Sequence, residues 1–477
     1  MSILILGYGK TGRAVYDYID TAEDLCEKDL IIIYDDTAKI SHAGVKSDKN
    51  VLFFNKSNEE VLVNKYLKSV EACITSPGIE RNHKLILMLK KYNVPIYGEI
   101  EFAYNNRPKK DSKIVCITGT NGKTTTATLC KSAIEKAGLS GKTFIGGNLG
   151  IPFISGIKDY DDFFLEISSF QLEWIYDFKP DIAVLLNVED DHLDRYENFD
   201  EYRLTKYKLF KNLRSRDIAV LNYGDYNSRI LRGVTGSKSV LFGFDESKCD
   251  VYYKDDSINL RLKEICGFDA RISLKNIIDK RKFVIEDMMA AACLLMLYGI
   301  SPDTIVSSFE EYRLLKHRVE YVGNIGNIEF YDDSKATNPA AVISALRSFA
   351  GKNAVVILGG KDKGFNYESL IKPLKEAVKA CVLMGETKDI LINTLSGSGI
   401  DLMEADDMCD AVKKSFDFLN NNLIINKNDK EAAEGAGAVI LSPASSSFDM
   451  FKDYNERGDV FKKCYRNLKE NFKDIEN

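Results

Sequence analysis

The sequence predicts an α/β protein built mainly from parallel sheets. Three apolar runs of strand type, at residues 3–6, 114–117 and 354–358, each lead into a glycine-containing loop and a helix-like segment. Strands that are apolar on both faces and alternate with helices are typical of parallel sheets covered on both sides. A chain of 477 residues is too long for one hydrophobic core, so we expect three domains.

Two segments indicate where these domains end. The polar stretch from Asn105 to Asp111 contains Pro108 and suits a linker. The second boundary follows a helical pattern that runs from Glu286 through Tyr298 to about Tyr312. We therefore expect domains at residues 1–108, 109–314 and 315–477.

Composition and charge argue against several classes of protein. Hydrophobic residues make up 45% and charged residues 29%, as in ordinary globular proteins. The net charge of −6 argues against nucleic acid as the main partner. No apolar run approaches the ~18 residues of a membrane-spanning helix, and the N-terminus lacks the features of a signal peptide. The ten cysteines include no C-x-x-C pair, so we expect buried free thiols in a reducing cytoplasm.

The first glycine loop, Gly7 to Gly12, follows a strand and has the spacing G-x-G-x-x-G. With Asp35 some twenty residues beyond it, the pattern by itself suggests a Rossmann-like domain that binds NAD. A fingerprint of this kind is weak alone. An NAD-dependent oxidoreductase would also leave the second glycine loop unexplained.

The second glycine loop predicts ATP binding. Gly119, Gly122, Lys123 and Thr124 come directly after the buried strand and open a helix. Glycines let backbone N–H groups curve around a phosphate, the lysine adds positive charge, and the threonine hydroxyl can bind Mg²⁺. The common pattern G-x-x-x-x-G-K-[ST] would need glycine at Ile117, so this loop is a shortened variant.

Three residues downstream could belong to the same site. Glu166 ends a strand, where it could hold Mg²⁺ or simply cap the next helix. His192 follows another strand among four acids, as a metal ligand or as part of a solvated acidic loop. Spacing alone does not distinguish Lys206 from a solvated helix lysine. A nucleotide-binding protein without catalysis is one alternative, against which the full set of candidate metal ligands speaks.

With these residues, motifs along nearly the whole chain resemble those of the Mur ligases: residues 119–124, 146–150, 166–172, 187–195, 317–318, 333–338, 359–364 and 441–458. Within this family, the string Ser168 to Leu172 resembles the enzymes that add D-glutamate to UDP-N-acetylmuramoyl-L-alanine. Other amide ligases of the superfamily, with a different amino acid or in folylpolyglutamate synthesis, are the alternative.

The resemblance implies three α/β domains: an N-terminal Rossmann-like domain for the UDP moiety, a central P-loop-type ATPase domain and a C-terminal Rossmann-like domain. It implies ATP-dependent amide-bond formation through an acyl phosphate and a tetrahedral intermediate, with two Mg²⁺ ions. The enzyme would serve peptidoglycan precursor synthesis, and so cell shape and division, as a cytoplasmic monomer.

The resemblance also implies roles for individual residues. Catalysis is assigned to Lys123, Glu166, His192, Lys206 and Arg318. Metal ligands would be Thr124, Glu166, His192 and Lys206 as a carbamate. ATP contacts would be Gly119, Thr120, Asn121, Gly122, Lys123, Thr124, Thr125, Arg318, Asp333 and Lys335. Contacts to the UDP substrate would be Gly9, Lys10, Thr11, Asp35, Asp36, Ser76, Pro77, Gly78, Asn148 and His192. D-Glutamate contacts would be Thr337, Lys363, Ser447, Phe448 and Tyr454.

The chain departs from the family pattern at two places. Many relatives have a His-Asn pair where this chain has Phe283-Val284, and an Asn where Asp287 stands, which argues against nucleotide contacts from this segment. Some relatives offer an arginine to the uracil where this chain has Asp35 and Asp36. We therefore expect the contacts with the uracil to differ from those in these relatives.

Overall fold

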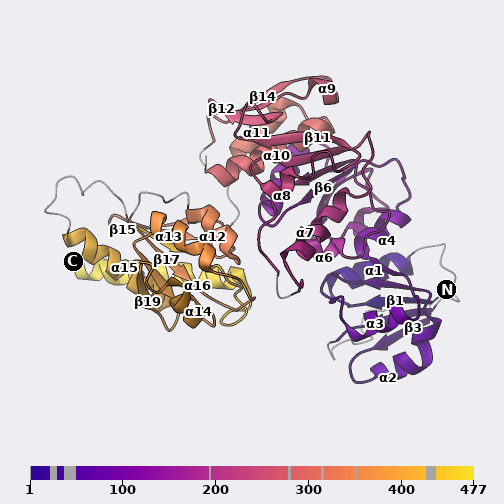
Figure 1. The fold of residues 1–477 in the computed structure, drawn as a ribbon, viewed down its shortest axis with the longest axis horizontal. Coiled ribbons are helices and arrows are strands. Elements are labelled where there is room, and N and C mark those ends of the chain that lie inside the picture. The colour runs from indigo at the N-terminus through magenta and orange to yellow at the C-terminus, as the bar shows by residue number, and fades with distance from the viewer. Residues whose placement is uncertain are drawn as a thin grey trace. The chain divides into compact units, whose positions relative to one another are not determined.

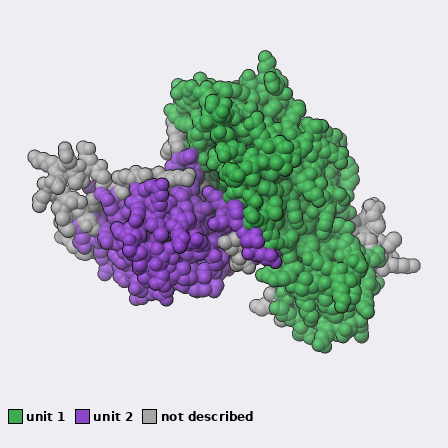
Figure 2. Space-filling view, viewed as in Figure 1, with its two compact units in different colours: residues 1–188, 200–280, 284–312 green, residues 189–199, 281–283, 313–477 purple. Residues whose placement is uncertain are grey.

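The computed structural model describes residues 2–21, 30–36, 50–192, 195–277, 281–312, 316–346, 349, 353–425 and 437–476 (Figure 1). The chain divides into two compact units, coloured separately in Figure 2. Unit 1 comprises residues 1–188, 200–280 and 284–312, and unit 2 comprises residues 189–199, 281–283 and 313–477. Mostly parallel sheets with helices make up both units, which confirms the predicted α/β class. The predicted domain limits at residues 108 and 314 stay a prediction.

The first sheet of unit 1 is parallel, in the order β3-β2-β1-β4-β5. Its strands are β1 (Ser2–Leu6), β2 (Leu30–Tyr34), β3 (Asn50–Phe54), β4 (Ala72–Thr75) and β5 (Ile96–Gly98). The helical segments are α1 (Lys10–Asp20), α2 (Glu59–Val61), η1 (Leu62–Tyr66), η2 (Leu67–Ser69), α3 (Lys84–Lys91) and α4 (Glu99–Asn106). The strand order reverses between β1 and β4, and open α/β sheets bind ligands at such a point.

The second sheet of unit 1 has nine strands in the order β14-β13-β12-β11-β10-β9-β6-β8-β7. It is parallel from β7 to β12, and β13 and β14 add an antiparallel edge. The strands are β6 (Ile114–Thr118), β7 (Thr143–Gly147), β8 (Asp162–Glu166), β9 (Ile182–Leu185), β10 (Ile218–Asn222), β11 (Lys238–Gly243), β12 (Val251–Lys254), β13 (Ser257–Leu260) and β14 (Ala270–Ser273). All five residues of β6 are buried, as the apolar run predicts.

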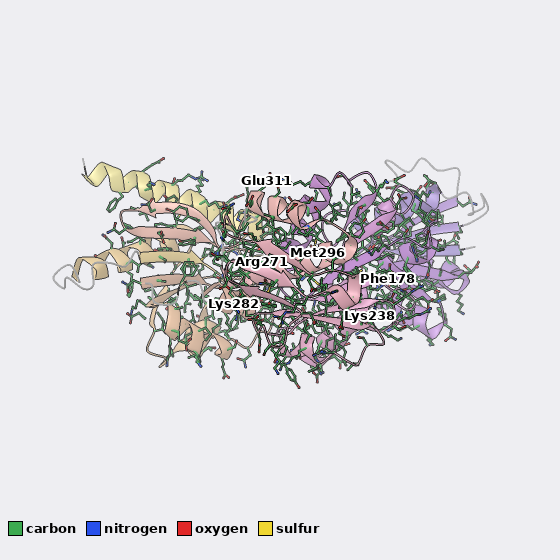
Figure 3. All side chains as sticks on the ribbon, turned by 90° about the horizontal axis from the view of Figure 1, so that it is seen from above. Phe178, Lys238, Arg271, Lys282, Met296 and Glu311 are labelled. Carbon is green, nitrogen blue, oxygen red and sulfur yellow. A yellow bond between two sulfur atoms is a disulfide. The ribbon has the colours of Figure 1, made fainter. Side chains whose placement is uncertain are left out.

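The helical segments around this sheet are α5 (Lys123–Lys136), η3 (Phe153–Gly156), α6 (Ser169–Leu172), α7 (Phe199–Tyr207), η4 (Lys208–Phe210), α8 (Tyr226–Arg229), α9 (Lys263–Cys266), α10 (Lys282–Tyr298) and α11 (Pro302–Glu311). Helix α10 is buried over most of its length, including Met296, labelled in Figure 3. The continuous helical pattern to about Tyr312 is broken into two helices. Gly299 ends α10 at φ +112°, and the Ser301 side chain caps the start of α11.

Unit 2 contains a six-stranded sheet in the order β15-β16-β20-β17-β18-β19, parallel except at the β15–β16 hairpin. The strands are β15 (Glu320–Ile325), β16 (Ile328–Asp332), β17 (Asn353–Leu358), β18 (Ala380–Leu383), β19 (Asp401–Glu404) and β20 (Gly437–Leu441). The helical segments are α12 (Pro339–Leu346), η6 (Glu368–Leu370), α13 (Ile371–Ala377), α14 (Lys388–Leu395), α15 (Met408–Ile425) and α16 (Tyr454–Glu476). Val356 packs into one hydrophobic cluster and Val355 into another, so β17 is buried on both faces.

One expectation about the cysteines is wrong. Cys409 on α15 and Cys464 on α16 form a disulfide within unit 2. The pair could not be predicted from the sequence, because 55 residues separate the two cysteines and the fold alone brings their helices together. The other described cysteines are free, and all but Cys266 are buried, as predicted.

The described helices include none that is both long and apolar enough to cross a membrane.

Candidate active site

The phosphate-type loop of unit 1 lies between β6 and α5, where the sequence places it. Gly122 has φ +84° and precedes the first helical residue, Lys123. The Lys123 ammonium donates to the carbonyl oxygens of Gly119 and Thr120, both at 2.8 Å. The lysine therefore lies folded over its own loop, at the N-terminus of a helix of 14 residues. Such a terminus favours an anionic ligand.

Glu166, at the end of β8, lies beside this loop. Its Oε1 accepts a hydrogen bond from the Asn148 amide at 2.7 Å and one from the Thr124 hydroxyl at 3.4 Å. Its Oε2 is buried and has no hydrogen-bond partner among the described residues. A buried carboxylate oxygen without a donor is costly and suits a bound cation. The structure thus brings together three predicted residues from different segments of the chain.

Helix α7 brings Lys206 to the same loop. The Lys206 side chain is 1% exposed, and its ammonium donates to the Gly119 carbonyl at 2.8 Å. Tyr202, one turn earlier, is hydrogen-bonded through its hydroxyl to Thr120 at 3.0 Å. Lys206 is therefore buried beside the phosphate loop. The alternative interpretation, a solvated lysine on a helix, is wrong.

Asp287 on α10 was not predicted as a site residue, yet it lies against the loop. A Cβ added at Gly122 would come within 2.2 Å of Asp287 Oδ1. The glycine is therefore required both by its positive φ and by the close approach of this carboxylate. Phe283, four residues earlier, instead packs against a hydrophobic cluster of unit 2.

Most of the residues predicted to contact the UDP substrate lie at the carboxyl edge of the first sheet, whereas Asn148 and His192 lie elsewhere. Asp35 accepts from the backbone N–H of Tyr8 at 2.7 Å, and Ser76 donates to the Gly7 carbonyl at 2.8 Å. Asp36 lies 3.5 Å from a ring nitrogen of His83. Gly9 and Lys10 are exposed at the start of α1. Thr11 is the second residue of α1, and Pro77 and Gly78 belong to the loop that follows β4.

His192 lies in the part of unit 2 contributed by residues 189–199. Its backbone is left-handed at φ +58° and its N–H donates to Asp191 at 2.9 Å. Asp191 is 7% exposed, accepts from the Asn338 amide at 3.1 Å and lies 4.0 Å from the Lys363 ammonium. Asp191, which was not predicted as a site residue, thus links His192 to Lys363. Residues 193–194 of the motif at 187–195 lie outside the described residues.

Two loops of unit 2 are tied together by Arg457, on α16. Its guanidinium is buried and donates to Ser334 and to the carbonyl oxygens of Ser445 and Ser446 at 2.8–3.1 Å. Burial lowers the pKa of Arg457 to about 10, so it stays charged near neutral pH. The role of Arg457 could not be predicted from the sequence, because it depends on contacts with Ser334, 123 residues away.

Around this arginine the predicted amino-acid and ATP residues of unit 2 gather. Ser447 is buried, Phe448 is 71% exposed, and the Lys335 ammonium lies 3.7 Å from the Tyr454 ring centroid. Asp333 accepts from the Ser442 hydroxyl at 2.7 Å and from the Val319 N–H at 3.2 Å. Burial raises the pKa of Asp333 to about 7. Arg318 and Thr337 are partly buried in the segments beside it.

A second group of possible metal ligands, His317, Glu320 and Asp332, already holds a cation. The Lys462 ammonium lies 2.6 Å from Glu320 and 3.4 Å from Asp332. The ring of His317 is hydrogen-bonded to Asp332 at 2.7 Å. We therefore interpret this group as an ion-pair network that holds the His317-Arg318 segment.

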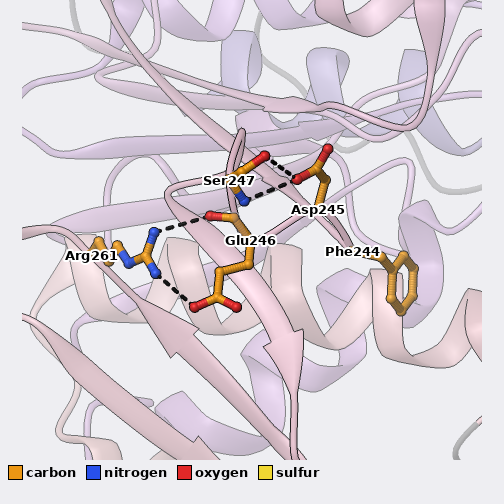
Figure 4. A pocket seen from close by; sticks show the side chains of 5 residues that line it. All are labelled: Phe244, Asp245, Glu246, Ser247 and Arg261. Carbon is orange, nitrogen blue, oxygen red and sulfur yellow. Dashed lines mark hydrogen bonds and ion pairs between the residues drawn. The ribbon is translucent and has the colours of Figure 1, made fainter.

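An open pocket of about 810 Å³ in unit 1 is lined by Phe244, Asp245, Glu246, Ser247 and Arg261 (Figure 4). Arg261 donates to the carbonyl and carboxylate of Glu246 at 3.0 and 3.1 Å. None of the five is a predicted site residue, so we do not assign the pocket to the active site.

Comparison with known proteins decides the family. Residues 117–295 match the Mur ligase middle domain, and residues 317–425 match the Mur ligase glutamate ligase domain. A UDP-N-acetylmuramoylalanine--D-glutamate ligase of Thermoanaerobacter sp. (strain X514) is 32% identical over 98% of both chains. The chain belongs to the Mur ligase family. A ligase of the same name from Geotalea uraniireducens is 36% identical over 83% of both chains.

Solved Mur ligase structures share this fold. The chain matches MurF from Acinetobacter baumannii with a TM-score of 0.59 and 14% identity, over 96% of this chain and 93% of that one. It matches MurC from Thermotoga maritima with a TM-score of 0.55 and 16% identity, over 98% and 100%. At this identity the match concerns the Mur ligase fold alone.

Proposed function

We propose that this chain joins D-glutamate to the carboxylate of UDP-N-acetylmuramoyl-L-alanine at the expense of ATP. The observation that carries the proposal is the similarity, over 98% of the chain, to ligases named for this reaction. The γ-phosphoryl group of ATP moves to the substrate carboxylate, which leaves ADP and an acyl phosphate. The amine of D-glutamate attacks the acyl carbon through a tetrahedral intermediate, loses a proton and displaces phosphate.

Residues of unit 1 are proposed to hold ATP and metal. Lys123 would leave the carbonyl oxygens of its own loop for the β- and γ-phosphates. Glu166 and Thr124 would hold Mg²⁺, which neutralises charge on the triphosphate. The unpartnered Oε2 of Glu166, noted above for the described residues, supports this assignment. We infer a second ion at His192.

Lys206 is proposed to act as a carbamate. Its neutral amine would add to CO₂, forming an N–C bond with loss of one proton, and the anionic oxygens could then orient Mg²⁺. The buried Lys206 ammonium, 2.8 Å from the Gly119 carbonyl, supports this proposal, because the modified group would lie beside the phosphate loop.

The remaining assignments concern the two other substrates. We propose that Gly9, Lys10 and Thr11, with the Ser76 to Gly78 turn, bind the diphosphate of the UDP substrate. Asn148 would contact the same substrate, and Asp35 and Asp36 would lie toward its uracil. Lys363, Ser447, Phe448, Thr337 and Tyr454 would bind D-glutamate, since a lysine and hydroxyls suit a dicarboxylate. Arg318, Asp333 and Lys335 would contact ATP. We expect a cytoplasmic monomer.

A phosphate-release assay tests the function. Purified protein with Mg²⁺ and ATP should release phosphate only when UDP-N-acetylmuramoyl-L-alanine and D-glutamate are both present. Lys206→Ala should be nearly inactive and be partly rescued by short carboxylic acids. Equal release with L-lysine or meso-diaminopimelate in place of D-glutamate would favour another ligase of the superfamily. Full activity of Lys206→Ala would contradict the carbamate.

A further inference from the structure

Helix α7 contacts the phosphate loop through one face. Tyr202 and Lys206 are four residues apart and so lie one above the other on that face. Their side chains reach Thr120 and Gly119, at 3.0 and 2.8 Å. The Lys206 ammonium also lies 4.7 Å from the Tyr202 ring centroid. Any shift of α7 would therefore move Lys206 relative to the loop.

Glu201, next to Tyr202, joins the same helix to the first sheet of unit 1. Its carboxylate forms an ion pair with the Arg81 guanidinium, and each side chain is about one third exposed, at 33% and 34%. Arg81 lies in the segment between β4 and α3. That segment starts with Ser76, which is hydrogen-bonded to Gly7 in the first glycine loop. The ion pair thus links a loop beside β1 to the helix that carries Lys206.

Further hydrogen bonds hold the chain from Glu201 to Lys208, which lies two residues beyond Lys206. The Lys208 ammonium donates to the Glu173 carbonyl at 2.9 Å. The Thr205 hydroxyl donates to the Glu201 carbonyl at 2.8 Å and stiffens the turn between Glu201 and Lys206. The chain from Glu201 to Lys208 is thus held at one end by the ion pair with Arg81 and at the other by the Glu173 carbonyl.

We propose that Arg81 and Glu201 are positioning residues that couple the first-sheet substrate loops to the phosphate loop. Closure of the Ser76 to Arg81 segment on a diphosphate would carry α7, and with it Lys206, into its working position. This inference rests on the proposed function, which assigns the diphosphate to that segment. Binding at either site would then favour binding at the other, since coupling between sites is reciprocal.

Calorimetry on the full chain tests the coupling. The affinity for UDP-N-acetylmuramoyl-L-alanine is measured with and without Mg²⁺-ADP, and the ratio is the coupling factor. In the unmodified chain, we expect the factor to exceed one. Arg81→Gln and Glu201→Gln should each lower it by about two- to fivefold, as expected for a partly exposed ion pair. The double variant Arg81→Glu with Glu201→Arg should restore most of the coupling factor.

Lys109→Gln is the matched control, because it removes an ion pair with Asp161 that does not involve α7. This variant should leave the coupling factor unchanged.

A kinetic readout separates positioning from general damage. The single variants should raise the KM for the UDP substrate and the Mg²⁺ concentration for half-maximal rate by about two- to fivefold, and leave the KM for D-glutamate unchanged. A factor of one in the unmodified chain, equal factors in all variants, or no recovery in the double variant would overturn the inference. Absence of phosphate release from the unmodified chain with both substrates would instead count against the proposed function.

Discussion

Two buried glutamates in unit 1 carry an oxygen that has no hydrogen-bond partner among the described residues, Oε2 of Glu99 and Oε2 of Glu166. Glu166 lies beside the phosphate loop, where its free oxygen suits a cation. Glu99 begins α4, and its other oxygen accepts from the Ile154 N–H at 2.7 Å. Burial raises the pKa of Glu99 to about 7. The same local feature thus indicates a metal ligand at one residue and a pH-dependent stability at the other.

Glu99→Gln should make the stability of unit 1 less dependent on pH. The folded pKa of about 7 exceeds the ordinary glutamate value of 4.5, so the folded state binds more protons than the unfolded state between these two values. The contribution of Glu99 is therefore most favourable below about pH 4.5, is lost as pH rises toward 7, and is constant above. Glutamine is neutral throughout and should be more stable than glutamate at about pH 8, by up to about 3 kcal/mol.

Urea unfolding at about pH 5 and about pH 8 measures this difference. The gap between the midpoints of the two proteins should widen with pH. A gap that stays constant, or that narrows as pH rises, would show that Glu99 is ionised without penalty in the folded chain.

At the residue scale, motif positions could be predicted and cross-chain partners could not. Lys123 and Thr124 follow from the loop pattern because that pattern is local. Asp191 and Arg457 were missed because their partners lie 147 and 123 residues away. Lys206 needed the family resemblance, since nothing in the spacing of a helix lysine indicates burial.

At the scale of elements, apolar runs predicted the strands and the loops that follow them. The runs at 3–6, 114–117 and 354–358 are β1, β6 and β17, each buried as in a parallel sheet. The helical pattern near residue 300 was too coarse to show that Gly299 separates α10 from α11. The packing between elements could not be predicted from the sequence, and α16 is an example.

Gly458→Ala on α16 should damage the site although alanine favours a helix. A Cβ at this position would come within 2.1 Å of His317 Nδ1 and 2.6 Å of Asp332 Oδ2. The His317–Asp332 hydrogen bond of 2.7 Å would therefore have to break or shift. Arg318, which is proposed to contact ATP, directly follows His317. We expect a loss of about 1–3 kcal/mol of stability and a higher KM for ATP.

Thermal unfolding and ATP kinetics measure both effects. Gly141→Ala is the matched control, because a Cβ there meets nothing within 4 Å, and it should behave as the unmodified chain. Helix propensity alone predicts that Gly458→Ala is more stable than the unmodified chain by about 1 kcal/mol. That result would show that the His317 ring does not pack against position 458 as closely as the structure has it.

At the scale of the whole molecule, the predicted site residues are divided between the two units. Lys123, Glu166 and Lys206 belong to unit 1, whereas Arg318 and Lys363 belong to unit 2. The order of motifs along the chain predicted this division only in part. Residues 189–199, which carry His192, fall in unit 2 although the chain on either side of them belongs to unit 1. The assignment of residues 189–199 to unit 2 depends on tertiary contacts, which no local sequence pattern predicts.

The Cys409–Cys464 disulfide gives a test that distinguishes the units. It closes a loop of 55 residues, for which chain entropy predicts about 4 kcal/mol, and native disulfides are typically worth about 2–4 kcal/mol. Cys409 is exposed, so a dithiol reductant can attack the bond without prior unfolding. Reduction should therefore lower the unfolding temperature of unit 2 by roughly 5–15 °C and leave that of unit 1 unchanged.

Differential scanning calorimetry with and without dithiothreitol measures the shift, and alkylation with mass spectrometry counts the thiols. Cys409→Ser removes the bond but keeps a small polar side chain, so it should unfold at the reduced temperature and no longer respond to the reductant. In a reducing cytoplasm the two cysteines would remain thiols, because a disulfide persists there only if the fold protects it. If all ten cysteines react with the alkylating agent in the denatured, unreduced chain, α15 and α16 are held by packing alone and the two units should respond alike.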